Sequence, residues 1–250
     1  MGPPQQESPN DANLRPTAIL DWGSEEIRAL ISPTNKEHSS ASELRRIHSH
    51  LASILRPVYS VNEWQPASTT LRRRRGSCSQ RMACLEAVAR AAGIPTRVQA
   101  LRVSGKFWFP RFRMTRCFIP EEILLLWPQF FVEDEWRDFD ELHAPMEKLV
   151  AGSDDGFTNA GESLFEAVQH TPIDFLGKTC GMNCARPQHN LSGFVSNSEG
   201  YFETRDEALE KLGSFQFTIR GRIFELLYGD RSSAPKLSIN GPRPLSPGVK

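Results

Sequence analysis

Hydrophobic residues recur at helical spacing in two segments near the start of the chain. Residues 42–55 carry Leu44, Ile47 and Leu51 three or four positions apart, which is the spacing of one helix face. A shorter segment, residues 24–31, has a similar pattern. We therefore expect two amphipathic helices before residue 56.

A third helix is predicted over residues 78–91, which are rich in Ala, Leu, Met, Glu and Arg. Gly76 and Ser77 precede it, Gly93 follows at a natural C-terminal capping position, and Pro95 blocks its continuation. This is the strongest helical pattern in the chain.

The pattern then changes to alternation with a period of two. Residues 96–103 alternate almost strictly, which predicts a half-buried strand. Further strands are expected at Phe107–Phe109, interrupted by Pro110, and at Gln129–Glu133 and Trp136–Asp140, joined by a turn. A long helix followed by antiparallel strands predicts the α+β class.

The two ends of the chain differ from its centre. Residues 1–16 are rich in Pro, Gln, Asn and Ser, and residues 232–250 are rich in Pro, so we expect both to be disordered tails. Residues 17–150 are predicted to form the core. Residues 151–231 are predicted to be a helical and loop extension of the same domain, with helices near 161–168 and 205–212.

Charge and hydropathy exclude several classes of protein. The 250 residues include 30 Lys plus Arg and 30 Asp plus Glu, so the formal net charge is zero. Coating of nucleic acid or of an anionic membrane needs surplus positive charge, so neither partner is expected. Because the sequence shows no apolar run of about 20 residues and no secretion signal, a cytoplasmic location is expected.

The five cysteines are scattered and odd in number, which does not indicate a disulfide framework. Cys78 differs from the others because it opens the strongest predicted helix. Exposed backbone N–H groups and the helix dipole favour a thiolate there by about 1 kcal/mol. We therefore predict that Cys78 is the most reactive of the five thiols. An isolated cysteine at this position would be interpreted as a small packing residue.

Cys78 lies within a longer motif. The run Gly76-Ser77-Cys78 is followed by Ala89-Arg90-Ala-Ala-Gly93-Ile94-Pro95-Thr96-Arg97, and this order resembles the transglutaminase-like (papain-type cysteine) superfamily. The resemblance covers about residues 67–142. It implies a nucleophile-bearing helix packed on an antiparallel sheet.

The resemblance also implies the partners of the nucleophile. The family has a His-x-Trp strand and then a Trp followed four residues later by an Asp, which is matched here by Trp127, Trp136 and Asp140. Its catalytic histidine position is occupied by Leu125. The resemblance thus assigns Cys78 and Asp140 to the site but no base, and Asp140 is equally well interpreted as a polar strand end.

Three histidines are candidates to replace the absent base. His143 lies three residues after Asp140 and is the best placed, whereas His170 and His189 lie in the extension. For each one a structural role is the simpler interpretation. His48 and His50, beside the helical stripe of residues 42–55, are interpreted as partly exposed helix residues.

Two other clusters of residues have compositions typical of binding sites. Cys180, Cys184 and His189 supply three soft metal ligands but no second pair, so no metal site and no cofactor are expected. Basic and aromatic residues alternate between Arg97 and Arg116. This pattern indicates first a solvated strand face, and second a basic rim for an anionic substrate or an acidic carrier protein.

Two hypotheses of function follow. In the first, Cys78 attacks an amide or thioester and forms an acyl-enzyme, which hydrolyses or transfers its acyl group in the tailoring of a small molecule or a carrier-bound chain. A peptide is a further possible substrate. In the second, the chain is a binding or scaffold module in which Leu125 marks the loss of catalysis.

Overall fold

The computed structural model describes residues 8–31, 39–112, 114–143, 157, 159, 162–171, 173–177 and 191–231. Its α-helices are α1 (Glu25–Arg28), α2 (Ser40–Ile54), α3 (Ala67–Arg73), α4 (Cys78–Ala91), α6 (Leu164–Ala167), α7 (Arg205–Leu212) and α8 (Ile219–Tyr228). Its strands are β1 (Arg56–Pro57), β2 (Arg75–Gly76), β3 (Thr96–Ser104), β4 (Glu122–Val132), β5 (Glu135–Asp138) and β6 (Val195–Phe202).

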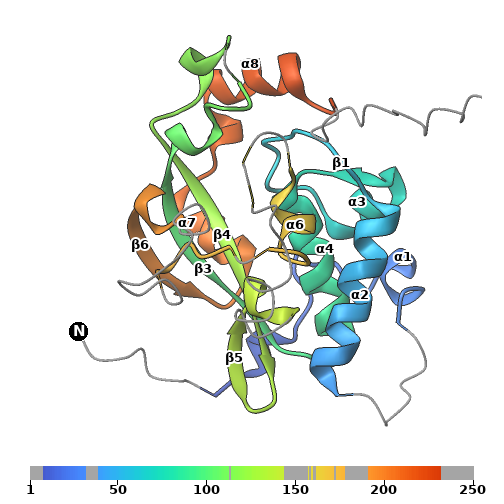
Figure 1. The fold of residues 1–250 in the computed structure, drawn as a ribbon. Helices are drawn as coiled ribbons and strands as arrows, with labels where there is room; N and C mark the ends of the chain where they lie inside the picture. The colour runs from blue at the N-terminus through green and yellow to red at the C-terminus, as the bar shows by residue number, and fades with distance from the viewer. Residues whose placement is uncertain are drawn as a thin grey trace, which may run out of the picture.

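A four-stranded antiparallel sheet in the order β5-β4-β3-β6 forms one layer of the fold. Helices α1 to α4 lie together on one side of it, with α4 between the sheet and the other helices (Figure 1). Helix α7 contacts β3 and β6, and α8 lies apart at one end. The predicted α+β class and the packing of the Cys78 helix on an antiparallel sheet are confirmed.

One contiguous core joins the helices to the sheet. Helix α4 is buried along most of its length, and its apolar residues meet those of α2, β3 and β4. Burial on every side explains why its sequence lacks a clear polar face. Such a helix is held by packing from all directions, so its first residue, Cys78, occupies a fixed position.

The predicted strand at Phe107–Phe109 is wrong. The chain leaves β3 at Ser104 and forms the 3-10 helix η2 (Gly105–Trp108), with the Ser104 hydroxyl accepting from the Lys106 N–H. Pro110 has no N–H to give to a ladder, so a continuing strand would be broken at this position. The next strand starts later, at Glu122.

The N-terminal segment is also more ordered than its composition predicts. Within the predicted tail, residues 11–13 form the 3-10 helix η1, and the buried Asn13 side chain donates to the Thr96 carbonyl at 3.2 Å. Arg90 of α4 donates to the carbonyls of Ala12 and Arg15 at 3.0 and 2.9 Å. Residues 232–250 lie outside the described residues.

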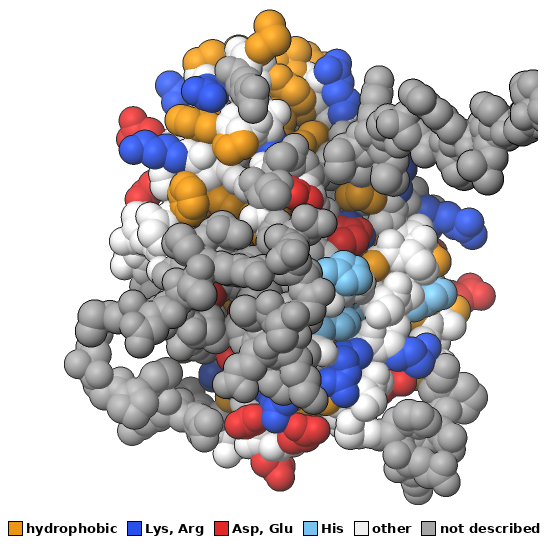
Figure 2. All heavy atoms as spheres, in the orientation of Figure 1, with side chains coloured by type: hydrophobic (Ala, Val, Ile, Leu, Met, Phe, Trp, Pro, Cys, Tyr) orange, Lys and Arg blue, Asp and Glu red, His pale blue; other side chains and the backbone are white. Residues whose placement is uncertain are grey.

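The remaining 3-10 helices are η3 (Arg116–Phe118), η4 (Phe139–Leu142), η6 (Ser192–Phe194) and η7 (Phe215–Phe217). Near η7, helix α8 turns Gly221 and Phe224 inward and leaves Ile219 and Leu226 exposed. Figure 2 shows apolar side chains gathered at this end of the molecule. Among the helices described, every one is too short or too polar to cross a bilayer.

Candidate active site

Cys78 is the first residue of α4, and local sequence explains its position. Ser77 is the N-cap: its hydroxyl accepts from the Gln80 N–H at 3.3 Å, and the Gln80 side chain accepts from the Ser77 N–H at 3.0 Å. This reciprocal pair is a capping box, which fixes the first helical turn. Gly76 is required before it, since a Cβ there would lie 2.8 Å from the Thr70 methyl group.

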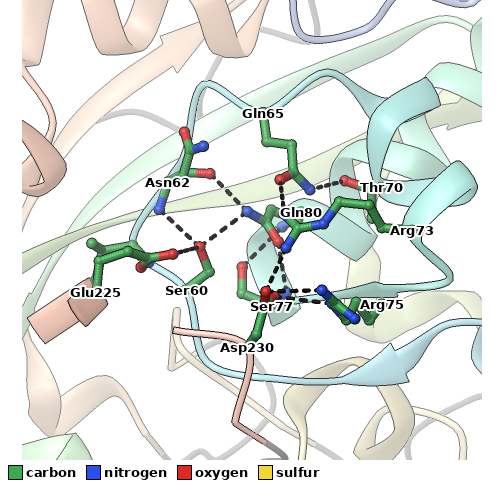
Figure 3. Close-up of polar contacts among 11 residues, drawn as sticks. Ser60, Asn62, Gln65, Thr70, Arg73, Arg75, Ser77, Gln80, Glu225 and Asp230 are labelled. Atoms are coloured by element: carbon green, nitrogen blue, oxygen red, sulfur yellow. Dashed lines mark hydrogen bonds and ion pairs between the residues drawn. The ribbon is translucent and has the colours of Figure 1, made fainter. Parts of the chain in front are cut away.

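A polar network holds the neighbouring loop against this turn (Figure 3). The Gln80 amide donates to Ser60 Oγ at 3.2 Å and to the Asn62 carbonyl at 2.9 Å. Glu225 of α8 accepts from Ser60 Oγ at 2.9 Å and from the Val61 N–H at 2.8 Å. Gln80, which caps the Cys78 helix, therefore also holds the loop, and Glu225 ties the same loop to α8.

A cavity of about 150 Å³ opens beside Cys78. Its walls come from the loop before α3, the segment after β3, strand β4, helix α6 and the α7–α8 region. Most of the lining is aromatic or aliphatic: Val58, Tyr59, Val61, Trp108, Phe112, Ile119, Ile123, Leu124, Leu125, Leu164, Leu209, Phe215 and Phe224. The thiol thus faces an apolar chamber.

Glu63 and Arg111 are the charged residues that line this cavity. Burial raises the pKa of Glu63, in opposition to a short hydrogen bond that its Oε2 accepts from the Ser79 hydroxyl. Ser79 in turn accepts from Arg205 Nη1 at 3.0 Å. Glu63 can therefore hold a proton at a pH where an ordinary glutamate has lost it.

Arg111 is the basic residue of the cavity wall. Its Nη2 donates to the Glu162 carbonyl at 2.6 Å, whereas its buried Nε makes no hydrogen bond to the described part of the chain. The cavity thus combines apolar walls with one acidic and one basic group.

Cys78 Sγ lies 3.2 Å from Ser163 Oγ, which belongs to the N-cap of α6. The same hydroxyl lies 3.1 Å from Nη1 of Arg81, one turn along α4 from Cys78. Ser163 and Arg81 were not singled out from the sequence. A serine before Leu-Phe-Glu is typical of an N-cap, but nothing in that pattern indicates a contact with Cys78.

Asp140 lies in η4 and is buried. Its Oδ1 accepts from the indole N–H of Trp127 at 3.2 Å. Burial, followed by the nearby Asp138 and Glu141, raises the pKa of Asp140 well above its usual range. The structure therefore pairs Asp140 with the tryptophan of β4, and the carboxyl releases its proton at a higher pH than an ordinary aspartate.

His143 contacts another histidine. Its Nε2 lies 2.5 Å from Nδ1 of His48, whose Nε2 lies 2.7 Å from the Phe165 carbonyl. Because that carbonyl accepts, His48 carries its proton on Nε2 and His143 donates to Nδ1. Burial lowers the pKa of His48 to about 3 and that of His143 to about 4, so both rings are neutral at pH 7.

Residues 28–141 match the sequence model of the transglutaminase-like superfamily. The match includes α4, the sheet strands β3 to β5 and η4 up to Glu141. Residues 28–141 are a transglutaminase-like domain. No curated protein and no solved structure matches the chain.

Leu125 of the transglutaminase-like domain lies opposite Leu101 in the β3–β4 ladder and lines the cavity together with Cys78. The sequence resemblance predicts the family's histidine at this position, where the cavity wall carries an aliphatic side chain. Cys78 is hydrogen-bonded to Ser163, and Asp140 accepts a hydrogen bond from Trp127. The hydrogen-bond partner of His143 is His48. The catalytic roles of these three residues stay predictions.

The other thiols and histidines of the chain are placed as follows. Cys84 is buried within α4, where burial raises its pKa to about 12, and Cys117 is exposed. His170 is exposed, whereas His48 is buried rather than partly exposed as predicted. Cys180, Cys184 and His189 lie outside the described residues. The described residues contain no group of three side chains that could hold a metal ion.

The basic and aromatic residues from Arg97 to Arg116 form local contacts around the transglutaminase-like domain. The Arg97 guanidinium lies over the rings of Trp136 and Tyr201, at 4.2 and 4.4 Å from their centroids. Arg102 pairs with Glu199 at 3.0 Å. These contacts agree with the strand-face interpretation, whereas Trp108, Arg111 and Phe112 of the cluster line the cavity.

Proposed function

We propose that this chain is a cysteine acyltransferase or hydrolase that forms an acyl-enzyme on Cys78. One observation carries the proposal: the thiol at the start of a capped, buried helix opens into a cavity lined by apolar side chains. The domain belongs to a superfamily of papain-like cysteine enzymes, which supports covalent chemistry at this sulfur.

The cavity favours an apolar acyl group of modest size. A cavity of roughly 150 Å³ lined by apolar side chains accommodates a ring the size of benzene. The walls contributed by Trp108, Phe112 and Leu125 suit an aromatic or short branched acyl chain. Arg111 is available at the cavity for an anionic part of the substrate, such as a carrier phosphate or a carboxylate.

A thioester suits this site better than an amide. The Cys78 thiolate attacks the carbonyl carbon, a new C–S bond forms, and the C–S bond to the leaving thiol breaks. That thiol leaves as a thiolate and needs no proton, so the step proceeds without an imidazolium. Water, an amine or a carbon nucleophile then attacks the acyl carbon, the C–S bond to Cys78 breaks, and the Cys78 thiolate re-forms. Glu63, which lines the cavity and whose pKa is raised by burial, would take the proton that this acceptor loses.

The test is incubation with the N-acetylcysteamine thioester of benzoic acid, followed by intact-mass measurement and peptide mapping. We expect one benzoyl group on Cys78. Cys78→Ser should abolish this adduct, whereas Cys117→Ser, the matched change at an exposed thiol, should retain it. Absence of an adduct on Cys78, or equal acylation of Cys117, would contradict the proposal.

A second candidate function is a binding module without catalysis. Leu125 favours it, because an aliphatic side chain on the cavity wall improves the binding of an apolar ligand and contributes no proton transfer. In that case benzoic acid or a similar apolar ligand would protect Cys78 from alkylation, while the thioester would leave the sulfur unmodified.

The predicted relocation of the base to His143 belongs to the first proposal and has its own test. If His143 serves as the base, His143→Ala should slow acylation of Cys78 by the thioester. An unchanged acylation rate in His143→Ala would show that His143 is not the base. Glu63 or solvent would then accept the proton.

A further inference from the structure

The sulfur of Cys78 has a polar neighbour supplied from a distant part of the chain. Ser163 Oγ lies 3.2 Å from Sγ, although the two residues are 85 positions apart. Ser163 is 6% exposed, so water does not compete effectively for its hydroxyl. The position of the hydroxyl is fixed by its role as N-cap of α6, where it accepts from the Phe165 N–H at 3.3 Å.

The direction of the Ser163–Cys78 hydrogen bond follows from the other two partners of the hydroxyl. Arg81 Nη1 at 3.1 Å and the Phe165 backbone nitrogen at 3.3 Å carry protons and are donors only. A serine oxygen has two lone pairs and one proton. Both lone pairs are occupied, so the proton points at Sγ and Ser163 is the donor.

The surroundings of Ser163 strengthen this donor. The Arg81 side chain is fully buried, pairs with Glu166 through an Nη1–Oε2 contact of 2.9 Å, and packs with its guanidinium 4.4 Å from the Phe165 ring centroid. A cation that donates to a hydroxyl oxygen polarises its O–H bond. Such a hydroxyl binds an anion more strongly than a neutral thiol, so the arrangement favours the thiolate form of Cys78.

We propose that Ser163, oriented by Arg81, is a positioning residue that holds the Cys78 sulfur and stabilises its thiolate. It supplies the anion-stabilising part of what a histidine does at such a site and leaves the proton transfer to another group. The inference rests on the proposed function in taking Cys78 as the nucleophile.

The test measures the rate of Cys78 alkylation by iodoacetamide between pH 5 and pH 10, with peptide mapping and exposed Cys117 as internal reference. Ser163→Ala should slow Cys78 alkylation at pH 7 by roughly threefold to tenfold, the effect of losing one charge-assisted hydrogen bond to sulfur. The pH profile should move to higher pH. Ser163→Thr, which keeps the hydroxyl, should restore both the rate and the profile.

Two further variants keep the test decisive. Ser24→Ala is the matched control, because Ser24 is the N-cap of α1, its buried Oγ makes no hydrogen bond to the described residues, and it lies outside the cavity lining. It should leave the rate unchanged. Ser163→Asp keeps an N-cap but adds a negative charge beside the sulfur, so it should alkylate more slowly than Ser163→Ala.

Thermal melting of each variant separates chemistry from folding. An unchanged rate in Ser163→Ala, or an equal loss in Ser24→Ala, would overturn the inference. If Ser163→Ala fails to fold, a Ser163→Asp rate equal to the parent's would overturn it instead. A rate loss in Ser163→Ala without acylation by the thioester would support the role of Ser163 and contradict acyl transfer, so the two failures remain distinguishable.

Discussion

Asp140 is a buried carboxyl whose role in catalysis stays a prediction and whose electrostatics can be measured. An aspartate that orients a histidine remains ionised beside its partner. Here the carboxyl is buried, accepts from Trp127 and lies near Asp138 and Glu141, and its pKa is raised well above the usual range. Because a proton on this carboxyl stabilises the fold, its effect on stability is a testable property.

We expect Asp140→Asn to raise the melting temperature at neutral pH. The unfolded chain releases the Asp140 proton near pH 4, whereas the folded chain keeps it to higher pH, so ionisation favours unfolding as pH rises above about 4. Asparagine cannot ionise and still accepts from Trp127. The difference in melting temperature between variant and parent should grow from near zero at pH 4 toward pH 8.

Thermal melts from pH 4 to pH 8 check this expectation. Asp11→Asn, the same substitution at an exposed carboxyl, is the matched control. A pH-independent difference for Asp140→Asn would show that the Asp140 carboxyl ionises as easily in the folded chain as in the unfolded one.

Strand β4 connects the residue scale with the cavity. Trp127 and Leu125 are two residues apart in this strand and both pair with β3, so their side chains lie on the same face of the sheet. The tryptophan packs against Phe139 and Phe175, and the leucine reaches the cavity of Cys78. A histidine at position 125 would therefore lie on the wall of the cavity that Cys78 also lines.

Leu125→His should have two opposite effects. Loss of leucine packing and burial of an imidazole should lower the free energy of unfolding by about 1–3 kcal/mol. The imidazole should raise the rate of Cys78 alkylation near pH 6, because an adjacent imidazolium stabilises the thiolate. Urea unfolding and iodoacetamide kinetics measure these two quantities.

Leu125→Gln is the control for that variant, because glutamine is polar but carries no charge. It should lose stability to a similar extent and leave the alkylation rate near the parent value. Equal rates in the two variants would mean that a side chain at position 125 does not act on the sulfur.

At the scale of the whole molecule, segments beyond the transglutaminase-like domain complete its site. Arg205 of α7 pairs with Glu86 at 2.6 Å and donates to the Leu126 carbonyl at 3.2 Å, which joins α7 to α4 and β4. Phe224 of α8 lines the cavity. Asp230, just after α8, accepts from Arg73 at 2.6 Å and from Arg75 at 3.0 Å (Figure 3).

We expect Glu225→Ala to loosen α8 and open the cavity. The change removes the acceptor of the Ser60 hydroxyl and of the Val61 N–H, at a cost of about 1–3 kcal/mol for each group left without a partner. Hydrogen exchange should become faster across residues 219–228, and Cys78 should be alkylated faster.

Glu225→Gln is the matched variant, because its amide oxygen still accepts one of the two hydrogen bonds. It should fall between the parent and Glu225→Ala in both measurements. Unchanged exchange in Glu225→Ala would show that apolar contacts, such as those of Phe224 with Phe112, hold α8 by themselves.

Local sequence was sufficient where a short segment specifies its own conformation. The Ser77–Gln80 capping box, the helix formers of residues 78–91 and the glycine and proline after them determine α4 and place Cys78 at its first turn. Alternation over residues 96–103 determines β3 in the same way. The Cys78 motif and the α+β class were predictable because these preferences act between neighbouring residues.

Tertiary structure decided what the local pattern does not encode. Strand β6 is largely polar and contains no buried residue, and α8 presents apolar residues to solvent, so neither shows the periodicity of a half-buried element. The contacts of Cys78 with Ser163, of His143 with His48 and of Glu63 with Ser79 join residues 16 to 95 positions apart. Such contacts depend on how complete elements pack, because a side chain acquires its partner and its hydration only after distant segments have closed around it.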